Sequence, residues 1–483
     1  MQVRVVSWAF LALFSSTGTV LAAQADDSAL RMKTVESGLV PSVSVSGSPA
    51  VERTIQDRMR AYHVPGVSIA VIQDYRIDWA KGYGVMDLGS KVPVSPETRF
   101  QAGSISKPVA AAGALKLVED GKVALDEDVN AKLRSWKVPE NAFTREQKVT
   151  LRRLLSHSAG LTVHGFPGYP ADAPLPSLID ILNGKNGANT PAVVVDTLPG
   201  TAWRYSGGGI TVMQLLMTDV TGSAFADLMQ RLVLSKVGMS NSSYQQPVPA
   251  VVRPFTATGY NPAGMPVPGK YHTYPEMAAA GLWTTPTDLA KFCIEIQKSR
   301  EGHSNAILNK KSVTEMLTLQ KGEWGLGFQL NLQAEAPRFL HGGADEGFRA
   351  ELICGFDGSG AIVMANSDNG SAVAHEVIQA IANAYHWRRM EPKVRSTAPL
   401  DAAALQKYAG TYDAGPFGNA SIRVQGDHLV TSSALATDLD LYPASEVQFF
   451  PLTSDLPDVR FSRDDKGEVV AVSMGALSAK KVR

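Results

Sequence analysis

The chain has 483 residues, of which 44% are hydrophobic and 19% are charged. This is the composition of a globular protein, and the length exceeds one ordinary core, so we expect one large and one smaller domain. The net charge is zero and no Lys/Arg cluster of the nucleic-acid-binding type occurs, which argues against a nucleic-acid partner.

The first residues, MQVRVVSWAFLALFSSTGTVLAAQADD, have the pattern of an export signal. Arg4 supplies the positive start, residues 5–14 form the apolar stretch, and residues 20–22 or 23–25 offer a small-residue cleavage site. The apolar stretch is too short to span a bilayer, and no later segment is long enough. We therefore expect a signal peptide over residues 1–25, a periplasmic or secreted protein, and no membrane span.

Up to about residue 389, helical and strand-like patterns alternate along the chain. The expected helices lie at residues 51–62, 104–121, 151–158, 210–220, from 285 onward, and 372–386. The expected strands lie at residues 67–74, 76–87, 324–332, 338–342, 348–356 and 360–367. Strands at both ends with helices between them indicate an α/β or α+β domain with a helical insertion. Residues 163–176 are rich in Pro and Gly, which predicts an irregular loop at the rim of a site.

The C-terminal part has a different pattern. Residues 390–399 (MEPKVRSTAP) have the composition of a linker, and short alternating strands such as SIRVQGDHLV and EVQFFPL follow. This spacing indicates a small all-β module. The predicted boundaries are therefore 26–389 for the large domain, 390–399 for the linker and 400–483 for the β-rich domain.

The chain has two cysteines, Cys293 and Cys354. Each lies in an apolar pattern, LAKFCIEI or ELICGF, so we expect two free, buried thiols. Export would also permit a disulfide between them.

The stretch GSISK places Ser104 and Lys107 three residues apart at the start of an apolar helix, where they share one face. A cation is misplaced there, because the positive end of the helix dipole favours acidic residues. The same field favours the neutral amine, which is a usable base, and the free backbone N–H groups beside the serine can hold an oxyanion. The alternative interpretation is an N-capping serine beside an exposed lysine.

Two later motifs supply partners for this pair. Tyr205 precedes a glycine run in WRYSGGGI, and His341 precedes two glycines in RFLHGGADEGF. These glycines allow a close approach of the backbone to a ligand.

Other polar residues are expected to have ordinary roles. His157 and His164 flank a glycine-containing loop without a carboxylate or thiolate to complete a metal set, so we expect structural or rim positions and no metal site. Residues 367–369 (SDN) are expected to form a turn and helix cap. Asp345 and Glu346 are expected to lie on a solvated loop.

The order Ser-x-x-Lys, Tyr-x-Gly, His-x-Gly resembles the serine β-lactamase and penicillin-binding protein superfamily. The chain is most similar to its class C-like serine hydrolases, which include esterases, D-amino-acid peptidases and transacylases. The flanking stretches LVEDGKVALDEDV, LRRLLSHSAGL, LWTTPTDLAKF and WGLGF agree, and the likeness covers residues 51–386. The tail, beginning LQKYAGTYD, resembles the lipocalin-like module of some relatives.

The resemblance implies an antiparallel sheet flanked by helices, a helical subdomain and a small all-β C-terminal domain. It also implies that Ser104 is the acylated nucleophile, that Lys107 is its proton partner, and that Tyr205 shuttles the proton to the leaving group. His341 stands where many relatives have lysine. The implied oxyanion hole consists of the backbone N–H groups of Ser104 and Ala344. The substrate-binding surface would then include three glycines, Gly207, Gly342 and Gly343.

Two departures from the family pattern affect the expected substrate. Gly207 replaces an asparagine that contacts a substrate amide, and His341 replaces a lysine that holds a substrate carboxylate. Since imidazole is largely neutral at pH 7, both changes favour esters, neutral amides or D-amino-acid peptides. We expect a small-molecule ester, amide or short-peptide substrate and no cofactor. A weak β-lactamase or D-Ala-D-Ala carboxypeptidase, and a silent relative that binds peptidoglycan fragments or a partner protein, are the alternatives. The acyl acceptor and the oligomeric state stay open.

Overall fold

The computed structural model describes residues 27–48, 52–333, 335–388, 390, 392–415, 418–433, 438–453, 456–475 and 477–482. The predicted signal peptide lies outside the described residues. Within the described ranges, no helix is both long enough and apolar enough to cross a bilayer.

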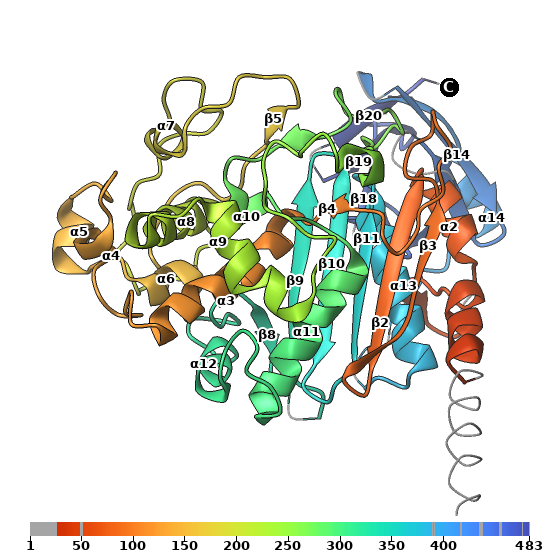
Figure 1. The fold of residues 1–483 in the computed structure, drawn as a ribbon. Coiled ribbons are helices and arrows are strands. Elements are labelled where there is room, and N and C mark those ends of the chain that lie inside the picture. The colour runs from red at the N-terminus through yellow and green to blue at the C-terminus, as the bar shows by residue number, and fades with distance from the viewer. Residues whose placement is uncertain are drawn as a thin grey trace, which may run out of the picture.

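A six-stranded antiparallel sheet forms the centre of the larger part of the molecule (Figure 1). The strand order is β3-β2-β11-β10-β9-β8. These strands are β2 (Gly66–Gln73), β3 (Arg76–Gly84), β8 (Gln329–Asn331), β9 (Arg338–Asp345), β10 (Phe348–Gly355) and β11 (Gly360–Ala365). The expected antiparallel sheet is thus confirmed, although the strand expected at residues 324–332 is limited to the three residues of β8.

Helices cover both faces of this sheet. Along β2, Ala70 and Ile72 belong to the apolar core on one face, and Ile69 and Val71 belong to the core on the other. Such two-sided burial explains why β2 is almost entirely apolar, with Ser68 and the terminal Gln73 as its polar residues. On the first face α11 contacts β2 and β11, and on the second α13 contacts β10 and β11. The covering helices are α2 (Ile55–Ala61), α11 (Pro286–Glu301) and α13 (Gly370–Ala384), and α12 (Lys310–Met316) packs on α11.

The helical subdomain lies between two short paired strands, β4 (Phe100–Gln101) and β7 (Trp283–Thr284). Its helices are η1 (Gly103–Ile105), α3 (Ser106–Glu119), α4 (Val129–Lys132), α5 (Ala142–Glu146), α6 (Leu151–Leu155), α7 (Leu178–Asn183), α8 (Gly207–Thr221), α9 (Phe225–Leu232) and α10 (Met277–Ala280). Helix α3 contacts α8, α9 and α10, so it is buried on nearly every side. Its sequence is correspondingly apolar between Pro108 and Leu115, and its polar residues lie in the first and last turns.

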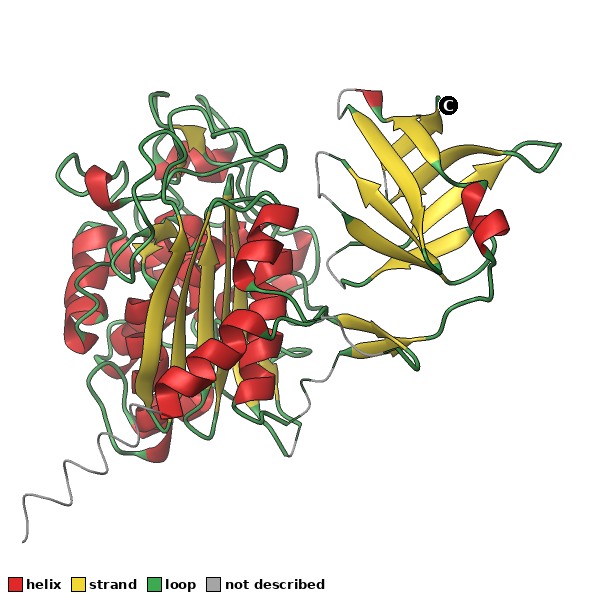
Figure 2. Ribbon diagram, turned by 90° about the vertical axis from the view of Figure 1, so that its right-hand side faces the viewer, coloured by secondary structure: helices red, strands yellow, loops and turns green. Residues whose placement is uncertain are grey.

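The C-terminal part is a closed antiparallel barrel (Figure 2). Its strands are β13 (Gly410–Asp413), β14 (Asn419–Gln425), β15 (His428–Ser432), β16 (Leu439–Pro443), β17 (Gln448–Pro451), β18 (Val459–Arg463), β19 (Val469–Met474) and β20 (Leu477–Lys481). Pairing of β13 with β20 closes the barrel. The short helix α14 (Ala402–Gln406) precedes it. The predicted all-β module is thus confirmed.

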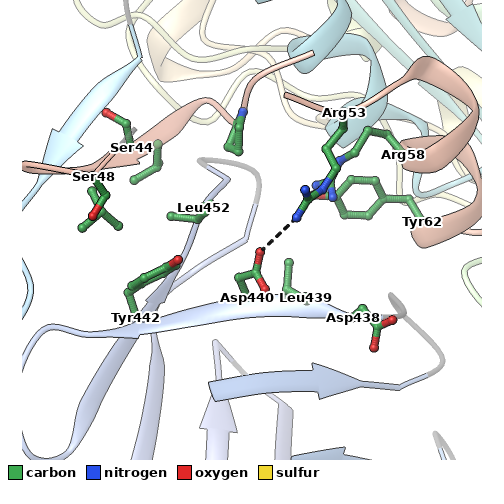
Figure 3. Close-up of a pocket in the computed structure, with 13 residues that line it drawn as sticks. Ser44, Ser48, Arg53, Arg58, Tyr62, Asp438, Leu439, Asp440, Tyr442 and Leu452 are labelled. Carbon is green, nitrogen blue, oxygen red and sulfur yellow. Dashed lines mark hydrogen bonds and ion pairs between the residues drawn. The ribbon is translucent and has the colours of Figure 1, made fainter. Parts of the chain in front are cut away.

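The segment expected to be a linker makes more contacts than its composition indicates. It contains β12 (Lys393–Arg395), which pairs in parallel with β1 (Val43–Val45). Arg53 reaches Asp440 of the barrel at 3.9 Å across a small pocket (Figure 3). The apolar core on the α13 face also continues into the barrel. The linker-like composition predicts that few contacts cross this segment. That prediction is wrong, because the partners of the segment come from distant parts of the chain.

The expectation of free cysteines is also wrong. Cys293 and Cys354 form a disulfide with a Cα–Cα separation of 6.5 Å, and both residues are fully buried. Helix α11 packs across β10, which places the two sulfur atoms together although 61 residues separate them in sequence.

Candidate active site

Ser104 and Lys107 are in direct contact. Ser104 lies in the 3-10 turn η1, and Lys107 is the second residue of α3. Lys107 Nζ donates a hydrogen bond to Ser104 Oγ at 2.8 Å and another to the carbonyl oxygen of Ala279 at 2.7 Å. Lys107 is 2% exposed, whereas Ser104 is partly accessible. The exposed-lysine alternative is therefore wrong, and the pair has the geometry of a nucleophile and its base.

Tyr205 lies beside this pair, as expected. Its ring centroid is 5.0 Å from Lys107 Nζ. The ring packs between those of His157, at a centroid distance of 4.3 Å, and His164, at 4.8 Å. The following residue, Ser206, caps α8 by accepting a hydrogen bond from Gly209 N–H at 2.8 Å. This cap fixes the backbone that carries Tyr205.

His157 has the structural role that the sequence indicated. Its Nδ1 accepts a hydrogen bond from the Ser206 N–H at 3.2 Å, and its carbonyl accepts one from the Arg204 N–H at 2.8 Å. Burial, together with the charge of Lys107, holds the pKa of His157 well below its usual range. A neutral His157 thus clamps the residues on both sides of Tyr205. His164 is exposed at the rim, and the described residues contain no cluster of three or more potential metal ligands.

His341 is part of β9 and is buried near the rings of Tyr205 and Trp324. Its Nδ1 donates a hydrogen bond to the Gly342 carbonyl at 2.6 Å, since a carbonyl can only accept. Nε2 is therefore an acceptor, and it has no hydrogen-bond partner among the described residues. Burial, reinforced by Lys107, lowers the pKa of His341 to about 3. This neutral imidazole can accept a hydrogen bond but cannot neutralise a substrate carboxylate.

Two glycines let β9 touch the turn that carries the nucleophile. Gly103 has a φ of 50°, and a Cβ atom there would lie 2.4 Å from Ala344 N. A Cβ atom on Gly343 would lie 2.1 Å from the carbonyl oxygen of Ala102. Strand β8 pairs only with residues 338–340, so the remaining edge of β9 faces η1. The Ala344 N–H thus lies next to the turn that carries Ser104.

Two of the glycines predicted to bind substrate, Gly207 and Gly342, make structural hydrogen bonds instead. Gly207 is buried at the start of α8 and its N–H donates to the His164 carbonyl at 2.9 Å, so it offers a ligand neither a side chain nor a free N–H. Gly342 is exposed, and its carbonyl orients His341.

The prediction of a solvated loop is wrong for Asp345. This residue ends β9 and is 5% exposed, because the strand alternation places it on the same buried side as His341 and Gly343. Glu346, in the following turn, is exposed as predicted. Residues 367–369 form the expected turn before α13, where Ser367 Oγ accepts a hydrogen bond from the Asn369 N–H at 3.2 Å.

Two tryptophans that were not predicted as site residues line the site. Trp324 meets the rings of His157, Tyr205 and His341 edge-on, at centroid distances of 4.8, 5.6 and 5.3 Å. Trp203 stacks on Trp324 at 5.9 Å and is 43% exposed at the rim. The stretch WGLGF, which contains Trp324, carried a family likeness but no polar motif, so residue chemistry gave no signal for it.

A family model described as Beta-lactamase matches residues 51–386. The chain belongs to the beta-lactamase family. It is 25% identical over 199 residues to Protein flp of Staphylococcus aureus (strain N315), covering 41% of this chain and 38% of that protein. The chain thus spans less than half the length of this curated relative. It is also 25% identical over 437 residues to the Unguisins hydrolase ungD' of Aspergillus campestris (strain IBT 28561), covering 77% of this chain and 78% of that protein.

Solved structures with the same fold superpose on nearly the whole chain. The octameric penicillin-binding protein homologue from Pyrococcus abyssi superposes with a TM-score of 0.58 at 21% identity, covering 96% of this chain and 100% of that chain. The structure of SurE with D-Leu superposes with a TM-score of 0.56 at 20% identity, covering 95% of this chain and 100% of that chain. At these identities the likeness concerns the fold alone.

Proposed function

We propose that this member of the beta-lactamase family is an exported serine hydrolase that forms an acyl-enzyme at Ser104. Its substrates would be short uncharged esters or amides, including D-amino-acid peptides. The observation that carries the proposal is the 2.8 Å contact between Lys107 Nζ and Ser104 Oγ, beside the close approach of η1 and β9. The word hydrolase in the name of the Aspergillus relative supports the reaction class.

Each residue of the site has a separate role in the proposed reaction. Ser104 Oγ attacks the substrate carbonyl while its proton passes to Lys107 Nζ, and the carbonyl oxygen becomes an oxyanion at the N–H groups of Ser104 and Ala344. Tyr205 then delivers the proton to the leaving oxygen or nitrogen as the carbonyl re-forms. Water attacks the acyl-enzyme in the second half-reaction, which releases the acid and returns the proton to Ser104.

The preference for uncharged substrates rests on His341 and Gly207. A neutral imidazole with a free acceptor at Nε2 suits a hydroxyl or N–H group of the substrate. Such an imidazole supplies no positive charge to a substrate carboxylate. Gly207 has no side chain to contact a substrate amide. Both features favour esters and neutral amides over β-lactams.

Export rests on the N-terminal pattern of residues 1–25. The disulfide between Cys293 and Cys354 supports it, since such bonds persist mainly in oxidising compartments.

A fluorophosphonate probe tests the acyl-enzyme. The probe should label the wild type and fail to label Ser104→Ala, and p-nitrophenyl butyrate should be hydrolysed with a higher kcat/KM than nitrocefin. A wild-type protein that is folded but neither labelled nor active on any ester would instead be a binding relative without catalysis. A higher kcat/KM for nitrocefin would contradict the proposed substrate class.

A further inference from the structure

Trp203 presents an exposed aromatic ring at the rim of the site, and no step of the proposed reaction uses it. It is 43% exposed, and its ring stacks on that of Trp324 at a centroid distance of 5.9 Å and an interplanar angle of 25°. A single exposed apolar side chain is ordinary on a protein surface. Trp203 differs from such a residue because its ring continues a row of rings that reaches Tyr205.

Trp324 is the middle of this row. It is 8% exposed, and its ring meets those of Tyr205 and His341 edge-on at centroid distances of 5.6 and 5.3 Å. Stacked and edge-to-face rings at such distances attract one another. The rings of Trp203 and Trp324, named here the tryptophan wall, therefore form an apolar surface that begins at Tyr205 and His341 and ends in solvent.

One tight turn holds both rings of the tryptophan wall in place. The Trp324 N–H donates a hydrogen bond to the Lys321 carbonyl at 3.0 Å, which closes the turn. Gly322, inside it, has a φ of 55°, a conformation that favours glycine, and a Cβ atom there would lie 3.9 Å from Cβ and Cγ of Trp203. The turn thus carries one ring and packs against the residue that carries the other. Because the wall is formed before a substrate arrives, binding to it requires little ordering of the protein.

The tryptophan wall lies on the leaving-group side of the nucleophile. In the proposed reaction Tyr205 protonates the leaving atom, so that atom must come within hydrogen-bond distance of the phenol, and Trp324 contacts the ring of Tyr205. The proposed oxyanion site is at the Ala344 N–H, three residues beyond His341 on β9, or about 10 Å along an extended strand. The wall meets β9 at His341. A group that extends past Tyr205, away from Ala344, therefore runs along the wall.

We propose that the tryptophan wall binds the leaving group of the substrate, and that this leaving group carries an apolar, preferably aromatic, substituent. In an ester this group is the alcohol portion, and in a peptide it is the residue that follows the cleaved bond. Stacking on the wall would hold the leaving atom at Tyr205 while the proton is transferred. This inference rests on the proposed function and narrows its substrate class.

Three esters separate the two sides of the cleaved bond. 2-Phenylethyl acetate carries a phenyl ring on the leaving group, its isomer ethyl phenylacetate carries the ring on the acyl group, and ethyl acetate carries none. In the wild type, kcat/KM for 2-phenylethyl acetate should exceed that for ethyl acetate about tenfold, the scale of one aromatic ring pair. Trp203→Ala should abolish this preference, and Trp203→Phe, which keeps a smaller ring, should restore most of it. The ratio of kcat/KM for ethyl phenylacetate to that for ethyl acetate should be the same in all three proteins.

Phe143→Ala is the matched control. It removes another aromatic ring, 38% exposed, from α5 at the outer end of the helical subdomain (Figure 1). The control should keep every ratio of the wild type, and melting curves show whether each variant folds.

A wild type without the preference for 2-phenylethyl acetate, or a Trp203→Ala variant that keeps it, would overturn the proposal. A loss of the same size for ethyl phenylacetate would also overturn it, because the wall would then not distinguish the leaving group from the acyl group. Fluorophosphonate labelling of Ser104 in the wild type shows in each of these cases that the proposed acyl-enzyme chemistry still stands. A wild type that the probe does not label would overturn the proposed function and this inference together.

Discussion

Gly343→Ala probes the contact between β9 and the turn that carries the nucleophile. The added Cβ would lie 2.1 Å from the Ala102 carbonyl oxygen, so the two segments must separate by about 0.9 Å before the contact reaches 3.0 Å. The Ala344 N–H moves with β9. A displacement of this size at a catalytic group costs about 10²-fold, and loss of an oxyanion donor costs about 10²–10³-fold. We expect kcat/KM to fall about 10²-fold, equivalent to about 2.7 kcal/mol of transition-state stabilisation.

Gly342→Ala is the matched control on the adjacent residue. Its added Cβ would lie 3.3 Å from Glu351 Oε1, at the end of a side chain that can move, and Gly342 is exposed. Its kcat/KM for p-nitrophenyl butyrate should stay within about threefold of wild type, because no backbone has to shift. Melting curves would show that both variants fold. Equal kcat/KM values for the two variants would refute the conclusion that the approach of β9 to Ala102 builds the oxyanion site.

Two further predictions concern the proton shuttle and the barrel. Tyr205→Phe keeps the ring between its two histidine neighbours and should lower kcat by about 10²–10⁴-fold with a smaller change in KM, the usual range for a general acid–base group. The loss should be larger for amides than for p-nitrophenyl esters, and equal losses would show that the phenol does not protonate the leaving group. Truncation after residue 392 should lower the melting temperature, since it removes β12 and the barrel side of the shared apolar core, while a fluorophosphonate probe still labels Ser104. A truncated protein that folds but is not labelled would show that the barrel is needed to form the site.

The local sequence determined the features that arise from residues close together in the chain, namely secondary structure and contacts within one helical turn. The apolar patterns at residues 67–74 and 104–121 predict a strand and a helix, and the structure buries both. The three-residue spacing of Ser104 and Lys107 predicts their contact, because one turn of helix brings such residues to the same face. The order of the three motifs carried the family resemblance, and the alternating pattern beyond residue 400 predicted the β-rich domain.

The tertiary structure alone decided which distant residues meet. The Cys293–Cys354 disulfide and the pairing of β1 with β12 join segments that are distant in sequence. The sequence pattern of each segment does not indicate which other segment it contacts. Asp345 lies two residues after Gly343 and precedes Glu346, so its local sequence indicates a solvated loop. It is buried because β9 continues past His341 and the strand alternation turns its side chain inward. Burial is set by what packs against a residue from elsewhere in the chain, and in Asp345 that burial raises the pKa of the carboxyl group.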